Sequence, residues 1–365
     1  MANYLSVDVL VVGLGPAGGS AAISAARSSL KVMAIDRRQN VGLPVQCAEF
    51  VPMPMSKHVQ GEGVLLQSID AMKSILPSGE VMHSDFPGLM IDRARFDQAL
   101  AIEATQHGAG IYQNSTMVEL DPENHCAKVK TPDGDLMVEY KLLIAADGPH
   151  SFVAHALGLP PLETIATRQY TVPLMQPYED TDVWLSDEYP GGYAWLFPRG
   201  KMANLGLGGD KSFLADLKIP LDALHKELQH QGVIGEEILS RTGGAIPVGG
   251  LRRKLVMENI LFVGDAAGLT HPITGAGIAA AVISGQRAGQ AAGDWVQGNN
   301  GNALENYEEE IRDQYEPVLL RAVERRRWLN NHWHTEFANS DVMHRRGWIA
   351  FPEYFQTMEL ATDES

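Results

Sequence analysis

A glycine-rich turn near the N-terminus constrains this sequence more than any other feature. Residues 7–13 read Val-Asp-Val-Leu-Val-Val-Gly, a β-branched run typical of a parallel strand buried on both faces. The turn Gly-Leu-Gly-Pro-Ala-Gly occupies residues 13–18, and small residues at helical spacing continue to residue 26. Residues 31–36, Lys-Val-Met-Ala-Ile-Asp, then form a second strand. The segment therefore predicts a complete β-α-β unit.

The turn matches the G-x-G-x-x-G pattern of dinucleotide-binding folds. Gly13 permits the tight turn, Gly15 lets the backbone approach a pyrophosphate, and Gly18 allows close packing of helix on strand. The helix start offers free N–H groups to phosphates, and Pro16 lacks only an N–H that the first turn does not use. Asp36 ends the second strand, where it can accept hydrogen bonds from adenosine ribose hydroxyls. The cofactor contacts predicted here are Gly13, Gly15, Pro16, Ala17, Gly18, Asp36 and Arg37. This unit alone does not distinguish FAD from NAD.

Two later segments indicate a flavin. Residues 142–151 run from a buried strand into an Asp-Gly turn, and residues 260–268 run from a strand into a Gly-Asp turn. Thr-His-Pro-Ile-Thr-Gly-Ala-Gly-Ile follows at residues 270–278. Together with Arg-Ala-Arg-Phe-Asp at 93–97, these segments resemble the fingerprints of the para-hydroxybenzoate-hydroxylase-like FAD superfamily. The resemblance implies that Asp265 contacts the ribityl and pyrophosphate region of FAD and that residues 275–278 approach the isoalloxazine ring.

A helix that starts after those glycines would suit a flavin. Its free N–H groups carry partial positive charge and would stabilise the anionic reduced ring at its N1–C2=O edge. The alternative is that Asp265 caps a helix and that the glycines serve packing alone.

Residues 190–198, Pro-Gly-Gly-Tyr-Ala-Trp-Leu-Phe-Pro, resemble the P-x-x-Y-x-W-x-F-P signature of the geranylgeranyl reductase family. Gln-Cys-Ala at 46–48 is similar to that family's cysteine-containing loop near the flavin, and residues 204–208 to its next strand. The implied activity is the reduction of isoprenoid C=C bonds by hydride from reduced FAD, which is held without a covalent bond. The further cofactor contacts implied by both resemblances are Cys47, Ala48, Arg93, Asp147, Gly148, Gly264, Asp265, Gly275, Ala276, Gly277 and Ile278.

Three residues are candidates for catalysis: Cys47, Tyr193 and Trp195. Tyr193, Trp195 and Phe197 alternate on a strand, so they share one face and could line an apolar tunnel for a prenyl chain. They could equally pack an interdomain core. Tyr193 could deliver a proton opposite the hydride, and Cys47 is either a ring-proximal contact or a small buried hydrophobic residue.

Charge and cysteine content exclude several classes of protein. The formal charge of −16 argues against nucleic-acid partners and against electrostatic docking on anionic membranes. Two cysteines, Cys47 and Cys126, predict neither a disulfide framework nor a metal cluster. The most apolar stretch, 260–283, contains an aspartate, a histidine and a proline, so we interpret it as core and expect no integral membrane segment. The first eight residues lack a cleavable apolar signal, which favours a cytoplasmic location.

The expected fold class is α/β. We expect a discontinuous Rossmann-type FAD-binding domain (1–64, 92–160 and 243–298), an interleaved β-sheet substrate domain (65–91 and 161–242), and a C-terminal helical region (299–365). Predicted helices cover 93–107, 221–239, a small-residue run ending near Trp295, and 303–327. The passage after Pro44 reads as loop-rich, and a short strand pair is expected around residues 77–79. Residues 118–136 predict a meander with its turn at 132–134, which leads into the strand at 142–146. Arg325 to Arg327, His332 and His334 are expected in solvent or at an interface, and the last dozen residues are expected to be disordered.

The electron path leaves alternatives open. NAD(P)H is the expected transient donor, although no second G-x-G-x-x-G marks a separate nicotinamide domain. The partner is a hydrophobic small molecule or lipid, or else a redox protein that accepts electrons. A flavin monooxygenase ranks lower, and a halogenase lower still because the W-x-W-x-I-P motif of halogenases is replaced by Tyr-Ala-Trp-Leu-Phe-Pro.

Overall fold

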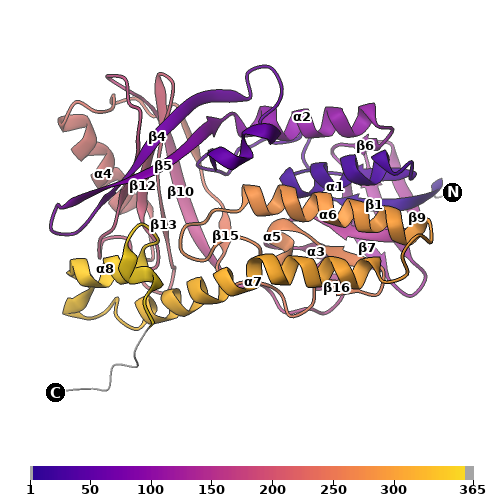
Figure 1. The fold of residues 1–365 in the computed structure, drawn as a ribbon. Coiled ribbons are helices and arrows are strands. Elements are labelled where there is room, and N and C mark those ends of the chain that lie inside the picture. The colour runs from indigo at the N-terminus through magenta and orange to yellow at the C-terminus, as the bar shows by residue number, and fades with distance from the viewer. Residues whose placement is uncertain (1–2, 358–365) are drawn as a thin grey trace.

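The computed structural model describes residues 3–357 and places them in two β-sheets connected and covered by helices (Figure 1). The predicted α/β fold, with a Rossmann-type domain, an interleaved second sheet and a C-terminal helical region, is confirmed. Within these residues, no helix combines the length and apolarity that crossing a bilayer requires.

The first sheet carries the glycine-rich turn. Its strands run in the order β16-β17-β9-β1-β2-β6, and β1 pairs in parallel with both β2 and β9. The predicted meander is present, because β7, β8 and β9 pair antiparallel and the turn at 132–134 joins the last two. The strands are β1 (Asn3–Val12), β2 (Val32–Ile35), β6 (Gly110–Tyr112), β7 (Thr116–Asp121), β8 (Cys126–Thr131), β9 (Gly134–Ala145), β16 (Val256–Met257) and β17 (Ile260–Phe262).

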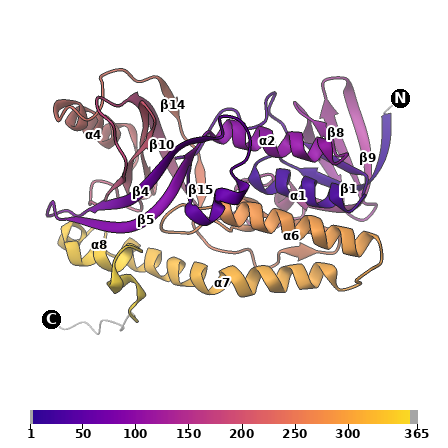
Figure 2. The same cartoon turned by 45° about the horizontal axis from the view of Figure 1, so that its top comes forward.

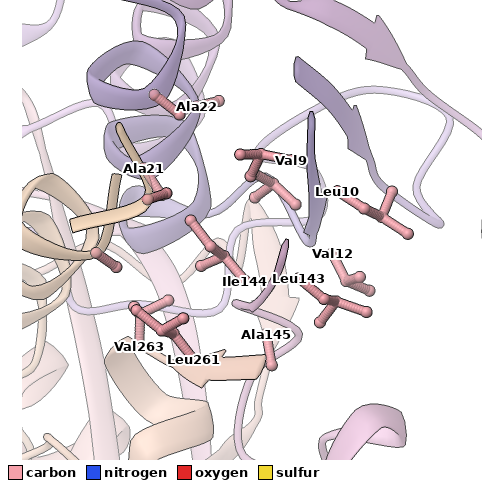
Figure 3. Close-up of a cluster of buried hydrophobic side chains, with 14 of the residues drawn as sticks. Val9, Leu10, Val12, Ala21, Ala22, Leu143, Ile144, Ala145, Leu261 and Val263 are labelled. Carbon is pink, nitrogen blue, oxygen red and sulfur yellow. The ribbon is translucent and has the colours of Figure 1, made fainter. Parts of the chain in front are cut away.

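Side chains from these strands and from α1 (Pro16–Arg27) form the core of this half of the molecule (Figure 3). Val9 and Leu10 of β1, Leu143 and Ile144 of β9, and Leu261 of β17 are completely buried. Such β-branched and leucine-rich runs are expected in parallel strands that are covered on both faces.

Helix α6 (Ile278–Val296), the predicted small-residue helix, lies almost backbone to backbone against α1. A β-carbon at Gly285 would lie 2.1 Å from the carbonyl oxygen of Ala17, and one at Gly289 would lie 2.4 Å from that of Ala21. These glycines therefore set the distance between α1, which begins in the glycine-rich turn, and α6, which follows residues 268–277.

The second sheet has the order β14-β10-β13-β12-β11-β4-β5-β3, with β15 beside β10. The strand pair predicted around residues 77–79 is the long β4–β5 hairpin, and the passage after Pro44 that we expected to be loop-rich also contains β3 and a 3₁₀ helix, η1 (Met53–His58). The strands are β3 (Phe50–Pro52), β4 (Leu65–Ile75), β5 (Val81–Ile91), β10 (Thr164–Pro173), β11 (Thr181–Trp184), β12 (Ala194–Arg199), β13 (Met202–Gly209), β14 (Ser240–Thr242) and β15 (Ala245–Pro247).

One predicted helix is too long. The helix expected over 221–239 is α4 (Lys218–His230), and the chain beyond it is not helical. Gly232 adopts a left-handed φ of 71°, which ends helices readily, and Leu239 then donates its N–H to the Thr171 carbonyl beside β10. The remaining helices are α2 (Arg93–Gln106), α3 (Phe152–Ala156), α5 (Gly264–Ala267), α7 (Ala303–Asn330), α8 (Asp341–Gly347), η2 (Glu336–Asn339) and η3 (Pro352–Phe355).

The long helix α7 runs beside α6 and continues to the second sheet, where α8 lies (Figures 1 and 2). Two arginines near its end, which we expected in solvent or at an interface, are buried against other segments of the same chain. Arg325 Nε donates to the Tyr354 carbonyl at 3.0 Å, and Arg326 Nη1 donates to the Gly191 carbonyl at 2.8 Å. The C-terminal region therefore packs onto the start of residues 190–198, which we call the aromatic motif.

The other residues of this region differ in exposure. Arg327 and His334 are exposed, whereas His332 is partly buried and its Nδ1 lies 2.7 Å from the Trp328 carbonyl oxygen. The predicted disorder of the last dozen residues falls largely on 358–365, which lie outside the described residues.

The contact between α1 and α6 generates a stability prediction. The G285A substitution should destabilise the fold by about 1–3 kcal/mol, because the added methyl group overlaps the α1 backbone and one helix must move. Thermal unfolding measures the effect. G301A is the matched control, because a β-carbon there meets no atom within 4 Å. Equal melting temperatures for the two variants would contradict the described packing.

Candidate functional site

The glycine turn leaves an open space above the start of α1. Gly13 (φ 99°) and Gly18 are closely packed, since a β-carbon at either would lie within 2.3 Å of a backbone oxygen. Above Gly15, by contrast, the nearest atom to such a carbon is Arg93 Nη2 at 3.9 Å. A pyrophosphate fits this space, because it would meet backbone, the helix N-terminus and a guanidinium group.

Arg93 is held rigidly at that position. Its Nε donates to Asp97 Oδ1 at 2.8 Å and its Nη2 donates to Asp97 Oδ2 at 3.1 Å. Burial acts to lower the pKa of Arg93, but the neighbouring Asp97 and Cys47 together raise it above its ordinary value, so the cation persists. The bidentate pair aims one fixed positive charge at the space above the turn.

Asp36 also lies at this turn. Its Oδ2 accepts a hydrogen bond from Leu14 N at 2.9 Å and its Oδ1 accepts one from Arg38 N at 2.8 Å. The side chain of Arg37, a predicted cofactor contact, is exposed, whereas Arg38 is partly buried and its Nη2 lies 3.4 Å from Gln46 Oε1. We did not single out Arg38 in the sequence, because two adjacent arginines gave no signal as to which one turns inward.

Two aspartates predicted to contact the cofactor are largely shielded from solvent. Asp147 Oδ2 accepts from Val153 N at 3.0 Å, while its buried Oδ1 has no partner among residues 3–357. Asp265 Oδ1 accepts from Thr270 Oγ1 at 2.6 Å and caps neither α5 nor α6. Burial raises the pKa of both carboxyl groups. An unpaired buried oxygen costs free energy and suits a ligand hydroxyl group, as FAD would supply.

The loop 268–277 leads into α6. We call it the flavin loop, because the resemblance described above predicts that its last residues approach the flavin ring. His271 organises it, because its Nδ1 accepts hydrogen bonds from Ile273 N at 3.3 Å and Thr274 N at 3.2 Å. Burial lowers the pKa of His271 to about 4, so the imidazole is neutral. The N-cap of α6 is Gly277, which supplies no side-chain hydrogen bond to the helix start. The first N–H groups of α6 are therefore available to a ligand. Gly275 N and Ala276 N, by contrast, already donate to the His271 carbonyl at 2.9 Å and to Thr274 Oγ1 at 3.3 Å.

Tyr193 and Trp195 tie the second sheet to this loop and to the turn at residues 47–49, which we call the cysteine turn. The Tyr193 hydroxyl donates to the Thr274 carbonyl at 2.5 Å, and burial raises the pKa of Tyr193. Trp195 Nε1 donates to Gln169 Oε1 at 3.2 Å, and Gln169 Nε2 donates to the Cys47 carbonyl at 3.0 Å. The hydroxyl hydrogen of Tyr193 is therefore engaged in holding the flavin loop.

Cys47 itself is partly buried. Its Sγ accepts a hydrogen bond from Glu49 N at 3.2 Å. Burial raises the pKa of Cys47, and Arg93 opposes the rise only in part, so the thiol is protonated at neutral pH. Ala48 is fixed through its carbonyl, which accepts from Asn204 Nδ2 at 3.2 Å.

Six aromatic rings continue from the flavin loop along the second sheet. Consecutive ring centroids are 4.8 to 6.4 Å apart. This aromatic row consists of Trp348, Tyr193, Trp195, Phe197, Phe50 and Phe86. Its first ring comes from the segment after α8 and is anchored by a 3.0 Å hydrogen bond from Trp348 Nε1 to Ser74 Oγ. Sequence reasoning missed Trp348, because nothing local indicates that a residue 155 positions later packs on Tyr193. Trp348, Trp195 and Phe197 are buried in a core cluster, whereas Tyr193, Phe50 and Phe86 are partly exposed, so the latter three rings are the ones that a ligand could contact.

Comparisons with known proteins find matches over most of the chain. Residues 7–193 match the family described as pyridine nucleotide-disulphide oxidoreductase, and residues 211–343 match the lycopene cyclase family. The digeranylgeranylglycerophospholipid reductase of Methanococcus aeolicus is 31% identical, over 93% of this chain and 90% of that one. The enzyme of the same name from Thermoplasma acidophilum is 32% identical, over 86% of this chain and 85% of that one.

A solved structure agrees. The geranylgeranyl bacteriochlorophyll reductase-like protein of Thermoplasma acidophilum superposes with a TM-score of 0.82 at 28% identity, covering 90% of this chain and 91% of that one. The glycine turn, the flavin loop, the cysteine turn and the aromatic motif thus occur in a chain that matches these proteins over most of its length. The chain belongs to the geranylgeranyl reductase family of FAD-dependent oxidoreductases.

Proposed function

We propose that this protein saturates C=C bonds in the isoprenoid chain of a lipid. The observation that carries the proposal is the aromatic row, which leads along β12 from the flavin loop to the cysteine turn. An extended apolar chain laid on these rings would lie beside both flavin-facing segments. The relatives named above are reductases of geranylgeranyl lipids, which supports this substrate class.

FAD would be held by the residues around the glycine turn and the flavin loop, and in its reduced form it supplies the hydride. Backbone at Gly15 and the α1 N-terminus would bind the pyrophosphate together with Arg93. The remaining proposed contacts are Gly13, Pro16, Ala17, Gly18, Asp36, Arg37, Cys47, Ala48, Asp147, Gly148, Gly264, Asp265, Gly275, Ala276, Gly277 and Ile278. We also propose that the chain divides into an FAD-binding domain (1–64, 92–160 and 243–298), a substrate domain (65–91 and 161–242) and a C-terminal helical region (299–365).

Saturation of a double bond adds a hydride to one carbon and a proton to the other, so a proton source is needed. The Tyr193 hydroxyl already donates to Thr274, whereas the Cys47 thiol keeps its proton because burial raises its pKa. We therefore assign the proton held at Cys47 Sγ to the second carbon, with solvent restoring the thiol afterwards. Tyr193 and Trp195 would hold the flavin loop and the substrate chain in place.

Hydride must reach FAD from outside the chain. We propose NAD(P)H as a transient donor and a cytoplasmic location for the protein. Transfer of electrons to a partner redox protein and flavin monooxygenation are the competing functions, and both are separated from lipid reduction by the first experiment below.

The first prediction concerns the substrate. The purified protein is reduced under anaerobic conditions and mixed with a geranylgeranyl lipid. We expect reoxidation of the flavin and a product heavier by two hydrogens for each bond reduced. A reduced flavin that ignores the lipid would contradict the proposal. It would then favour a protein acceptor, or oxygen if air reoxidised the flavin rapidly.

The second prediction concerns the phosphate site. R93M should weaken FAD binding by roughly tenfold or more, because a charge-assisted hydrogen bond contributes about 1.5–3 kcal/mol. R93K should fall between, since lysine keeps the charge but loses the bidentate geometry. Fluorescence titration of the apoprotein with FAD measures the affinity. R95M is the matched control, because Arg95 is an exposed residue of the same helix turn. Equal affinities for R93M and R95M would remove Arg93 from the site.

The third prediction concerns the proton. C47A should slow reoxidation of the reduced flavin by the lipid at least tenfold, whereas C126A, which changes the other free cysteine, should leave it unchanged. A raised thiol pKa means that Cys47 stays protonated through neutral pH. The wild-type rate should therefore be flat there and fall only above about pH 9, the ordinary thiol value. A wild-type rate in C47A would assign the proton to another group.

A further inference from the structure

Glu49 is a buried acid in an unfavourable backbone conformation. Its φ is 72°, in the left-handed region that residues with a β-carbon rarely adopt, and its side chain is 1% exposed. Burying a carboxylate also costs free energy unless hydrogen bonds and opposite charge compensate it. Two unfavourable contributions at one residue beside Cys47 indicate that the surroundings hold it there.

Three donors from separate elements converge on this carboxylate. Oε1 accepts from Arg93 N, the first residue of α2, at 3.0 Å. Oε2 accepts from Asn204 Nδ2 of β13 at 2.8 Å and lies 3.0 Å from Arg199 Nη1 at the end of β12. One side chain thus joins the start of the helix that carries Arg93 to two strands of the second sheet.

The backbone of Glu49 is fixed as well. Its N–H donates to Cys47 Sγ and its carbonyl accepts from Ile91 N at 2.9 Å. Asn204, which binds the carboxylate, also donates to the Ala48 carbonyl. The position of the thiol therefore follows from the same contacts that hold the carboxylate.

The pairing with Arg199 extends this link along β12. Because side chains alternate along a strand, Arg199 shares a face with Trp195 and Phe197 of the aromatic row. The Tyr193 hydroxyl binds the flavin loop before the first residue of this strand, and Arg199 binds Glu49 at its last. The aromatic face is thus tied at both ends to segments that would contact FAD.

We propose that Glu49 is a positioning residue for the reduction. Through its contacts with Arg199, Asn204 and Arg93 N, it fixes the Cys47 thiol and the Arg93 guanidinium relative to the second sheet, where the substrate would bind. This role in the reduction rests on the proposed function. The effects of Glu49 on the flavin midpoint potential and on the reactivity of the Cys47 thiol can be measured without any lipid substrate. Loss of the Glu49 carboxylate releases the cysteine turn and the start of α2 together.

E49Q is the diagnostic variant, because it keeps the size and the backbone of Glu49. Its amide offers one oxygen, while its NH₂ group must face at least one of the three donors, so the junction cannot be satisfied. We expect a shifted flavin midpoint potential, a changed rate of Cys47 alkylation by iodoacetamide, and reoxidation by lipid slowed about tenfold, since removing a partner from a buried hydrogen-bonded group has an effect of that order.

R199M tests the junction from the other side, and it serves also if E49Q fails to fold. Arg199 is the last residue of β12 in the second sheet and is 18% exposed. Its loss should move the same three measurements in the same direction, because it removes the positively charged partner of Glu49 Oε2. The double variant should be no worse than the more affected single variant, because the two residues act as one unit. D210N is the control, since it breaks another largely buried pair, with Arg326, away from the cysteine turn.

The measurements separate positioning from stability. A residue that only stabilises the fold would lower the melting temperature of E49Q without shifting the flavin potential of the folded molecules. An unchanged potential and unchanged alkylation in both E49Q and R199M would overturn the proposal. If the wild-type protein ignores the lipid, the proposed function fails, while the potential and the alkylation still decide the role of Glu49.

Discussion

The contact between the glycine turn, α1 and α6 is the constraint on which the rest of the structure depends. Backbone meets backbone at Gly13 and Gly18 and again at Gly285 and Gly289, so no side chain separates these segments. This contact brings the start of α1 and the start of α6 to the same side of the first sheet. Two helix N-termini are thereby available to one dinucleotide, and in the proposed binding mode the phosphates would lie near α1 and the ring near α6.

A second set of interactions joins this half of the molecule to the second sheet. The links are polar side chains in mostly buried surroundings: Tyr193 to the flavin loop, Gln169 and Asn204 to the cysteine turn, and Glu49 between α2 and Arg199. Directional hydrogen bonds fix distances more strictly than apolar contacts do, because unpaired groups in such surroundings are costly. A hydride transfer requires a fixed distance between donor and acceptor, which such links provide.

The C-terminal region completes the aromatic row. Helix α7 connects the two halves. Its buried Arg325 binds the Tyr354 carbonyl of the segment that carries Trp348, and its buried Arg326 binds the Gly191 carbonyl two residues before Tyr193. The acidic surface that a charge of −16 implies is thus compatible with an apolar site, because the apolar groups are enclosed by this segment.

Local pattern determined much of this protein. The β-α-β unit, the hairpin around residues 77–79 and the small-residue helix follow from short stretches of sequence, because strand and helix periodicity and glycine geometry are local properties. The family was indicated by the resemblance of residues 46–48 and 190–198 to its motifs. The end of α4 was missed, since a single left-handed glycine outweighed the apolar residues beyond it. Only the tertiary structure decided that Arg38 turns inward, that Trp348 covers Tyr193 and that Glu49 joins α2 to the second sheet. Those contacts link residues that lie far apart in the chain or depend on which way a side chain turns, and no local pattern encodes them.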